Sequence, residues 1–424
     1  MKTGWMKTAR LHLTDCPKED IMGFNPLKEK GIPVEKQIRN WSELNVKPYD
    51  KNAVHPYTRT RVILMNGIEV EGAMFTHQFA RHSDDMDIKR HLALTRRVEQ
   101  QQQKAVNWLT PGNETVLEVT IGYEQVAVDL TAFLARTEPD PYAKAVLDFA
   151  LLEDFDHLYR YANLMDLVEG KQAEKITGRF TEITVGRPTM LEHRHPFDEV
   201  RKHFDAKSAD FITQLHAMTI LAGEQQTMNF YMNVGNRPEG EIGRGLYQEI
   251  ALIEEQHVTH YESLLDPRMS WFEMLVLHEY NECYLYHSMV EEEVDPNIKK
   301  LWELHLGMEI EHLRIACEMM KKYEKRDPEE YLPKEVPQVL KFESNVDYVR
   351  EIIAAQMDYN AMETEFVPVA EIPKDGRYYA YQKIVNADGS PSEQVIKWHI
   401  DEKGQDYRQE IAGPHPTERY RARK

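Results

Sequence analysis

Histidines with an acid three residues earlier are the feature of this sequence that could carry chemistry. Four such pairs occur: Asp154 with His157, Glu192 with His195, Glu254 with His257, and Glu309 with His312. Residues three apart share one face of a helix, so a carboxylate and an imidazole at this spacing can bind the same metal ion. The count alone means little, because 71 acids in 424 residues would place an acid before about three of the 18 histidines by chance.

A further acid thirty residues upstream distinguishes three of the four pairs. It is Glu124 before Asp154, Glu224 before Glu254, and Glu279 before Glu309, whereas Ala162 precedes Glu192. Proline, glycine and charge interrupt each interval near its middle, at 136–141, 233–241 and 291–296. About four turns of helix, a loop and a returning helix would bring the thirtieth residue level with the first. Each unit is therefore predicted to be a helical hairpin.

The hairpins themselves repeat. A degenerate unit comes first, with Glu69 and Glu99 thirty residues apart and Gln102 in the place of histidine. The units begin at 69, 124, 224 and 279, so the interval within each pair is 55 residues (124 − 69 and 279 − 224) and the offset between pairs is 155 (224 − 69). We infer that a pair of hairpins was duplicated, and we expect about eight core helices in residues 62–324, with halves at 62–168 and 207–324.

The segments outside these halves carry weaker patterns. Residues 1–61 are expected to form an irregular N-terminal arm, and 169–206 a polar crossover long enough to follow a helix. In the C-terminal extension, 325–424, alternating apolar residues on both sides of Asp388-Gly389 predict a small β hairpin. The fold class expected is mainly α.

Composition excludes several classes of protein. The formal charge of −19 would repel a nucleic acid backbone, and no apolar run is long enough to cross a bilayer or to serve as a signal peptide. We expect a cytoplasmic protein without nucleic acid or membrane partners. The only cysteines are Cys16, Cys283 and Cys317, too far apart for a disulfide framework or an iron–sulfur site of local thiolates. Redox chemistry would have to use nitrogen and oxygen ligands.

In the spacing of these ligands the sequence resembles the ferritin-like di-iron carboxylate superfamily, which includes rubrerythrins, di-iron oxygenases and ribonucleotide reductase small subunits. The resemblance covers about half of the chain and implies an antiparallel helical bundle. It implies metal ligands at Glu124, Asp154, His157, Glu224, Glu254, His257, Glu279, Glu309 and His312, and a degenerate site at Glu69, Glu99 and Gln102. The implied cofactor is two iron ions, Fe²⁺ or Fe³⁺, per complete site, with manganese as an alternative.

The function expected from this resemblance is that of a non-haem di-iron oxidoreductase, an oxygenase or oxidase that activates dioxygen to oxidise or hydroxylate a small organic substrate. A separate reductase would supply electrons, and the enzyme would be a monomer or homodimer. Two alternatives stay open. One is iron oxidation or peroxide detoxification of the ferritin and rubrerythrin kind, and the other is a metal-free structural subunit of a larger oxidase.

The sequence also limits which hairpins can face each other. Short connections make hairpins one and two, and three and four, sequential neighbours, so a site with two-fold symmetry must form between the halves. Hairpin two can therefore pair with three, leaving one with four, or two can pair with four. We favour two with three, because that arrangement uses the long crossover in the usual way.

Overall fold

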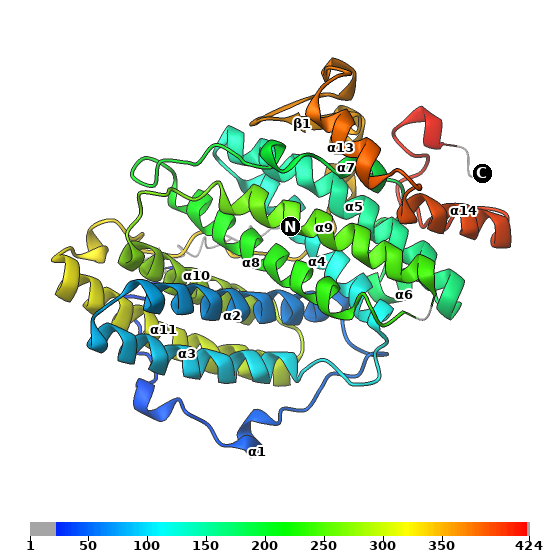
Figure 1. The fold of residues 1–424 in the computed structure, drawn as a ribbon. Coiled ribbons are helices and arrows are strands. Elements are labelled where there is room, and N and C mark those ends of the chain that lie inside the picture. Colours follow the sequence, from blue (N-terminus) through cyan, green and yellow to red (C-terminus); the bar gives the residue numbers. More distant parts are fainter. Residues whose placement is uncertain (1–22, 239, 422–424) are drawn as a thin grey trace, which may run out of the picture.

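Eight long antiparallel helices form the centre of the protein, seen in a computed structural model that describes residues 23–238 and 240–421 (Figure 1). They are joined in four hairpins. The bounds are α2 (Pro56–His82), α3 (Met86–Asn107), α4 (Val116–Thr137), α5 (Pro141–Glu169), α8 (Phe211–Val234), α9 (Glu241–Glu262), α10 (Trp271–Glu292) and α11 (Pro296–Glu324). The prediction of a mainly helical protein is confirmed.

The eight helices divide into two groups of four that mix the halves of the sequence. Helices α4, α5, α8 and α9 lie together in the upper part of Figure 1, and α2, α3, α10 and α11 lie below them. Helices α2 and α8 pack against each other where the groups meet. Gly67 permits this approach, since a Cβ atom there would lie 3.0 Å from the carbonyl oxygen of Ala222. Each group therefore contains one hairpin from each half.

The caps of the helices repeat with the same offset as the acids. Thr115 and Ser270 begin α4 and α10 with capping boxes closed by Glu118 and Glu273. The Asp-Pro steps at 140–141 and 295–296 begin α5 and α11, with Asp as the N-cap and Pro at the first helical position. Local sequence therefore sets the same hairpin geometry in both halves, which is what brings acids thirty residues apart level with each other.

Irregular segments enclose the helices. The described part of the N-terminal arm, from residue 23, contains only a 3₁₀ turn (Val34–Lys36) and α1 (Trp41–Leu44), and α2 begins at Pro56 rather than near residue 62. Residues 1–22 of the predicted arm lie outside the described part of the chain. The crossover between α5 and α8 contains α6 (Glu174–Thr177), α7 (Thr189–Glu192) and a 3₁₀ turn (Pro196–Asp198).

The β hairpin was predicted at the wrong place. Residues on both sides of Asp388-Gly389 form two helices, α13 (Arg377–Val385) and α14 (Pro391–Lys403), and the turn between them has Gly389 at φ +92°. Helix α14 packs on α9 and α5 through Val395 and His399. These residues are four apart, so they share one face of a helix, and the segment is helical rather than extended. The antiparallel pair is β1 (Tyr359–Met362) with β2 (Glu365–Pro368), which follow α12 (Val346–Gln356).

Apolar side chains fill both groups of helices. One apolar cluster centres on α2, α3, α10 and α11 and includes Leu64 and Trp302, and the other lies along α5 and α9 and includes Leu158 and Ile250. Within the described residues, no helix combines the length and apolar character needed to cross a bilayer. Acids inside these apolar groups therefore stand in surroundings that penalise an unpaired charge.

Candidate metal centre

Six ligand-type side chains meet in the middle of the upper group of helices. Glu124 comes from α4, Asp154 and His157 from α5, Glu224 from α8, and Glu254 and His257 from α9. We call them the first cluster. All six are at most 1 % exposed. The structure therefore brings hairpins two and three together across the crossover, and the ligands expected of that pairing lie side by side.

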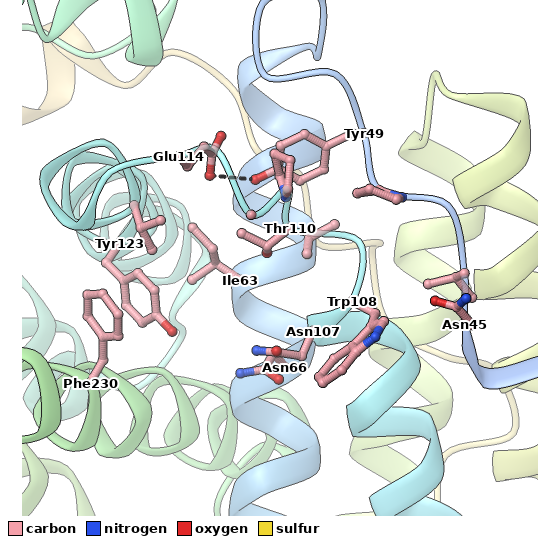
Figure 2. A pocket seen from close by; sticks show the side chains of 16 residues that line it. Asn45, Tyr49, Ile63, Asn66, Asn107, Trp108, Thr110, Glu114, Tyr123 and Phe230 are labelled. Carbon is pink, nitrogen blue, oxygen red and sulfur yellow. Dashed lines mark hydrogen bonds between the residues drawn. The ribbon is translucent and has the colours of Figure 1, made fainter. Parts of the chain in front are cut away.

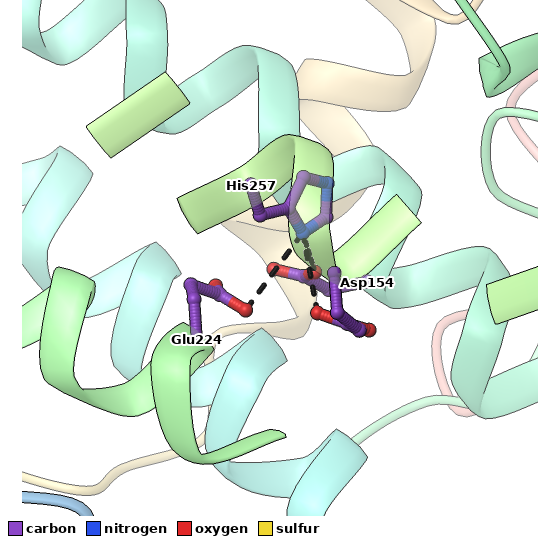
Figure 3. A group of neighbouring side chains, drawn as sticks. Asp154, Glu224 and His257 are labelled. Atoms are coloured by element: carbon purple, nitrogen blue, oxygen red, sulfur yellow. Dashed lines mark ion pairs between the residues drawn. The ribbon is translucent and has the colours of Figure 1, made fainter. Parts of the chain in front are cut away.

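Glu254 lies between the two imidazoles of the first cluster. His257 Nδ1 lies 3.4 Å from one Glu254 oxygen, and His157 Nδ1 lies 3.1 Å from the other. His257 Nδ1 also lies 3.3 Å from Asp154 and 3.7 Å from Glu224, which converge on it in Figure 3. Two sets of ligand atoms, one around His257 and one around His157, share Glu254 and would hold two cations.

Many polar atoms of the first cluster make no hydrogen bond although they are buried. These atoms are Asp154 Oδ1 and Oδ2, both Glu224 oxygens, Glu124 Oε2, Glu254 Oε2 and His257 Nδ1. Leaving one buried polar atom unpaired costs about 1–3 kcal/mol, and more for a charged group. Four carboxylates and two imidazoles match the ligand set of two divalent cations, whose charge would balance that of the acids. The residues present therefore fit a di-metal centre.

Protonation in the cluster follows from its burial. Burial raises the pKa values of Glu124, Asp154 and Glu224 above the ordinary range. Burial opposes ionisation of Glu254 as well, but the imidazoles of His157 and His257 on either side hold its pKa below the ordinary value. In turn, the surrounding acids raise the pKa of both imidazoles against the effect of burial. Without metal, the cluster therefore retains protons that a cation would displace.

The outer nitrogen of each imidazole meets a carboxylate that is not among the predicted ligands. His157 Nε2 lies 2.9 Å from Glu192 Oε2, and His257 Nε2 lies 3.0 Å from Glu153 Oε2. A proton on each Nε2, donated to these acids, leaves both Nδ1 lone pairs directed into the cluster. Glu192 belongs to the acid–histidine pair that lacked an upstream acid, and His195, its partner in sequence, caps a 3₁₀ turn instead. The only sequence feature that points to Glu192 is the high density of charged residues in the crossover.

A tyrosine holds a ligand in each group of helices. The Tyr231 hydroxyl donates to Glu124, and the Tyr286 hydroxyl donates to Glu69. The two tyrosines are 55 residues apart, the interval that also separates Glu224 from Glu279. The repeat could have revealed this pair of tyrosines, but only the fold shows that each reaches across to a hairpin of the other half.

Glu192→Ala is expected to weaken binding of the cation at His157 by about 10–100-fold, because the imidazole loses the carboxylate that sets its tautomer and orientation. The measurement is anaerobic Fe²⁺ titration against a competing chelator. Asp205→Ala is the matched control, since Asp205 is an exposed acid of the same crossover that pairs with Arg268. Equal affinities for the two variants would contradict a role for Glu192 at the centre.

Two buried arginines of the crossover anchor Glu153, the partner of His257. Arg187 Nη1 lies 3.0 Å and Arg194 Nη2 lies 2.9 Å from its carboxylate oxygens, and Arg194 also bonds Glu199. Arg194→Ala would remove the arginine partner of buried Glu199 and one of the two arginines at Glu153, so we expect it to lower the free energy of unfolding by about 3–5 kcal/mol. Urea denaturation measures this effect. The exposed ion pair of Lys397 and Asp401 offers the control, Lys397→Ala, for which little change is expected.

A second cluster occupies the corresponding place in the lower group of helices. It contains Glu69 on α2, Glu99 and Gln102 on α3, Glu279 on α10, and Glu309 and His312 on α11. His312 Nδ1 lies 2.9 Å from Glu309, 3.8 Å from Glu99 and 4.0 Å from Glu279. His312 Nε2 donates to Gln37 of the N-terminal arm over 2.7 Å. The nine ligands and the three degenerate positions expected from the sequence thus fall into two separate clusters.

No known protein family, curated protein or solved structure matches the chain. The functional assignment therefore depends on the residues of the two clusters and their surroundings.

Proposed function

We propose that the protein is a non-haem di-iron oxidoreductase that uses dioxygen to oxidise or hydroxylate a small organic substrate at the first cluster. The observation that carries the proposal is the convergence of four buried carboxylates and two imidazole Nδ1 atoms on two adjoining positions, with most of their polar atoms unpaired. Two iron ions held there would supply electrons for the reduction of dioxygen.

Each residue of the first cluster has a defined part in this proposal. His157 and His257 would provide one nitrogen ligand per ion, and Glu254 would span both positions. Glu124 would bind the ion at His157, and Asp154 and Glu224 the ion at His257. The Tyr231 hydroxyl keeps one oxygen of Glu124 occupied, and the other, which makes no hydrogen bond, would be free to bind a cation.

A cavity of about 580 Å³ offers a place for the substrate (Figure 2). It lies between α2, α4, α8 and the end of α3, and its wall includes Tyr123 and Phe230, whose rings stack with centroids 4.4 Å apart. Each of these rings directly precedes a residue at the first cluster, Glu124 or Tyr231. The amide of Asn66 adds a polar group to the same wall. Asn45, Asn107, Thr110 and Glu114 add further polar groups, so this lining favours a small molecule with both apolar and hydrogen-bonding parts.

Oxygen uptake by the iron-loaded protein tests the proposal. Anaerobic full-length protein would be loaded with Fe²⁺, exposed to oxygen with a chemical reductant, and screened against small aromatic and aliphatic compounds for oxidised products. We expect oxygen consumption that depends on iron in the first cluster, from a monomer or dimer. Inertness toward oxygen would reject the oxidase. Accumulation of iron far beyond two ions per cluster in a large shell would instead indicate iron storage, and failure to retain iron would indicate a structural subunit.

A further inference from the structure

The second cluster preserves one of the two ion positions of the first. Under the 55-residue interval, Asp154, Glu224, Glu254 and His257 correspond to Glu99, Glu279, Glu309 and His312. All four of these residues in the second cluster are at most 1 % exposed, and both oxygens of Glu99 and one of Glu279 make no hydrogen bond. The position at His312 therefore retains three carboxylates and one imidazole around a common point.

The other position of the second cluster has lost its imidazole. Gln102 stands where the first cluster has His157, and its amide Nε2 donates to Glu309. Glu69 corresponds to Glu124 and keeps one oxygen free of hydrogen bonds. An amide is a neutral oxygen or nitrogen group and a weaker ligand than imidazole for iron. This position therefore needs another donor if it is to hold a cation.

Glu282 provides that donor. It lies on α10 one turn after Glu279, is fully buried, and brings a carboxylate oxygen within 4.8 Å of oxygens of Glu279 and Glu309. Glu282 Oε2 makes no hydrogen bond, and Oε1 lies beside the imidazole of His278. The first cluster has no counterpart, because Thr227, 55 residues earlier on α8, turns its hydroxyl back to the carbonyl of Gly223 over 2.9 Å.

The residues around Glu282 hold its carboxylate and leave space for it. His278 Nε2 lies 3.0 Å from Glu282 Oε1, and His278 Nδ1 lies 3.1 Å from Glu71 on α2. Gly72 on α2 leaves the necessary space, since a Cβ atom there would lie 2.5 Å from His278 Nε2 and 3.2 Å from Glu282 Oε1. Any side chain at residue 72 would push this histidine and acid away. Glu282 is thus held in the cluster by His278 of its own helix and by the close approach of α2 at Gly72.

We propose that the second cluster is a separate metal centre with two unlike positions. One position is formed by Glu99, Glu279, Glu309 and His312, and the other, formed by Glu279, Glu282 and Glu309, has only carboxylate ligands. Hard oxygen ligands suit Mn²⁺ and similar cations, whereas imidazole favours iron and later metals. The ratio of Fe²⁺ affinity to Mn²⁺ affinity is therefore expected to be lower at the second centre than at the first cluster. This inference does not depend on the oxidase activity proposed for the first cluster.

Mn²⁺ binding to full-length, metal-free protein tests the second centre. The parent variant is His157→Ala/Glu254→Ala/His257→Ala, which removes both nitrogen ligands and the shared carboxylate of the first cluster, and Mn²⁺ is counted by equilibrium dialysis with elemental analysis. We expect this parent to retain about two ions per chain. Adding Glu282→Gln should remove about one of them. Glu303→Gln, at an exposed acid of α11, is the control that should remove none. A parent that binds no Mn²⁺, or a Glu282→Gln variant that binds as much as its parent, would overturn the proposal.

Two measurements keep the proposal testable if the combined variants do not fold. In wild-type protein loaded with Mn²⁺, pulsed electron paramagnetic resonance should detect some manganese without any nitrogen ligand, and nitrogen coupling to every bound ion would reject the carboxylate position. The single variant Gln102→His supplies the missing imidazole and should raise the ratio of Fe²⁺ to Mn²⁺ bound in competition. An unchanged ratio would reject the selectivity argument. Loss of oxygen uptake alone would bear on the first cluster and leave this result unaffected.

Discussion

His257→Ala should abolish iron binding at the first cluster and with it the reaction with oxygen, whereas His312→Ala should spare both. His257 Nδ1 faces Asp154, Glu224 and Glu254 within 3.3–3.7 Å and is the only nitrogen at that position. Removing it leaves converging carboxylates without the donor that completes the shell. Because removal of groups that merely orient a ligand costs about 10–100-fold, we expect loss of the ligand itself to exceed about 100-fold.

The comparison with His312→Ala is well matched. His312 occupies the corresponding place on α11, is equally buried at 1 % exposure, and would cost similar packing when truncated. Iron content per chain and oxygen uptake would be measured for both variants after anaerobic loading. Loss of both properties in His312→Ala but not in His257→Ala would transfer the oxidase to the second cluster. Loss in neither would reject metal-dependent oxygen chemistry in this chain.

Metal binding should stabilise the protein, and more so at pH 8 than at pH 6. A cation at 100 times its Kd adds about 2.7 kcal/mol to the free energy of unfolding for each site. Burial raises the pKa of Glu124, Asp154 and Glu224, and neighbouring acids raise the pKa of His157 and His257 despite burial. At pH 6 the metal-free cluster therefore holds protons that the cation must displace, which weakens binding.

Raising the pH changes the stability of the metal-free protein in the same direction through its carboxyl groups and through its imidazoles. A carboxyl group with a raised pKa in the fold binds more protons than in the unfolded chain, so raising the pH destabilises the metal-free protein. An imidazole with a raised pKa loses its stabilising charge as the pH rises through that value. Thermal unfolding with and without Fe²⁺ under anaerobic conditions, at pH 6 and pH 8, measures the effect. A larger shift in Tm at pH 6 would contradict the proton displacement, and no shift at either pH would contradict metal binding.

Local sequence is enough to predict the helical hairpins and the helix face on which their acids lie. A three-residue spacing puts Glu254 and His257 on one face of α9, and a thirty-residue interval interrupted by a turn puts Glu224 level with Glu254 on α8. Both relations depend only on helical period, caps and loop length, which are properties of neighbouring residues. The 155-residue offset similarly follows from the sequence and recurs in the caps of α4 and α10.

The C-terminal extension shows where local patterns fail. Alternating apolar residues near Asp388-Gly389 suggested strands, but the structure has α13 and α14 there. Short segments of mixed polarity fit either period, and the choice is made by the surface on which they pack. For α14 this surface is α9 and α5, which bury Val395 and His399. The sequence of the segment alone does not show that it packs on this surface.

The sequence by itself determined that acids line the insides of four helical hairpins and that histidines accompany them in three. Only the tertiary structure decided that hairpin two meets three, that Glu192 and Glu153 fix the two imidazoles, and that Glu282 enters the second cluster. The physical reason is the separation along the chain of the residues that make contact. A helix specifies which side chains share its face through contacts within a turn or two, whereas the partner of that face depends on the path of the crossover and on packing between segments about 100 residues apart, such as His157 and Glu254.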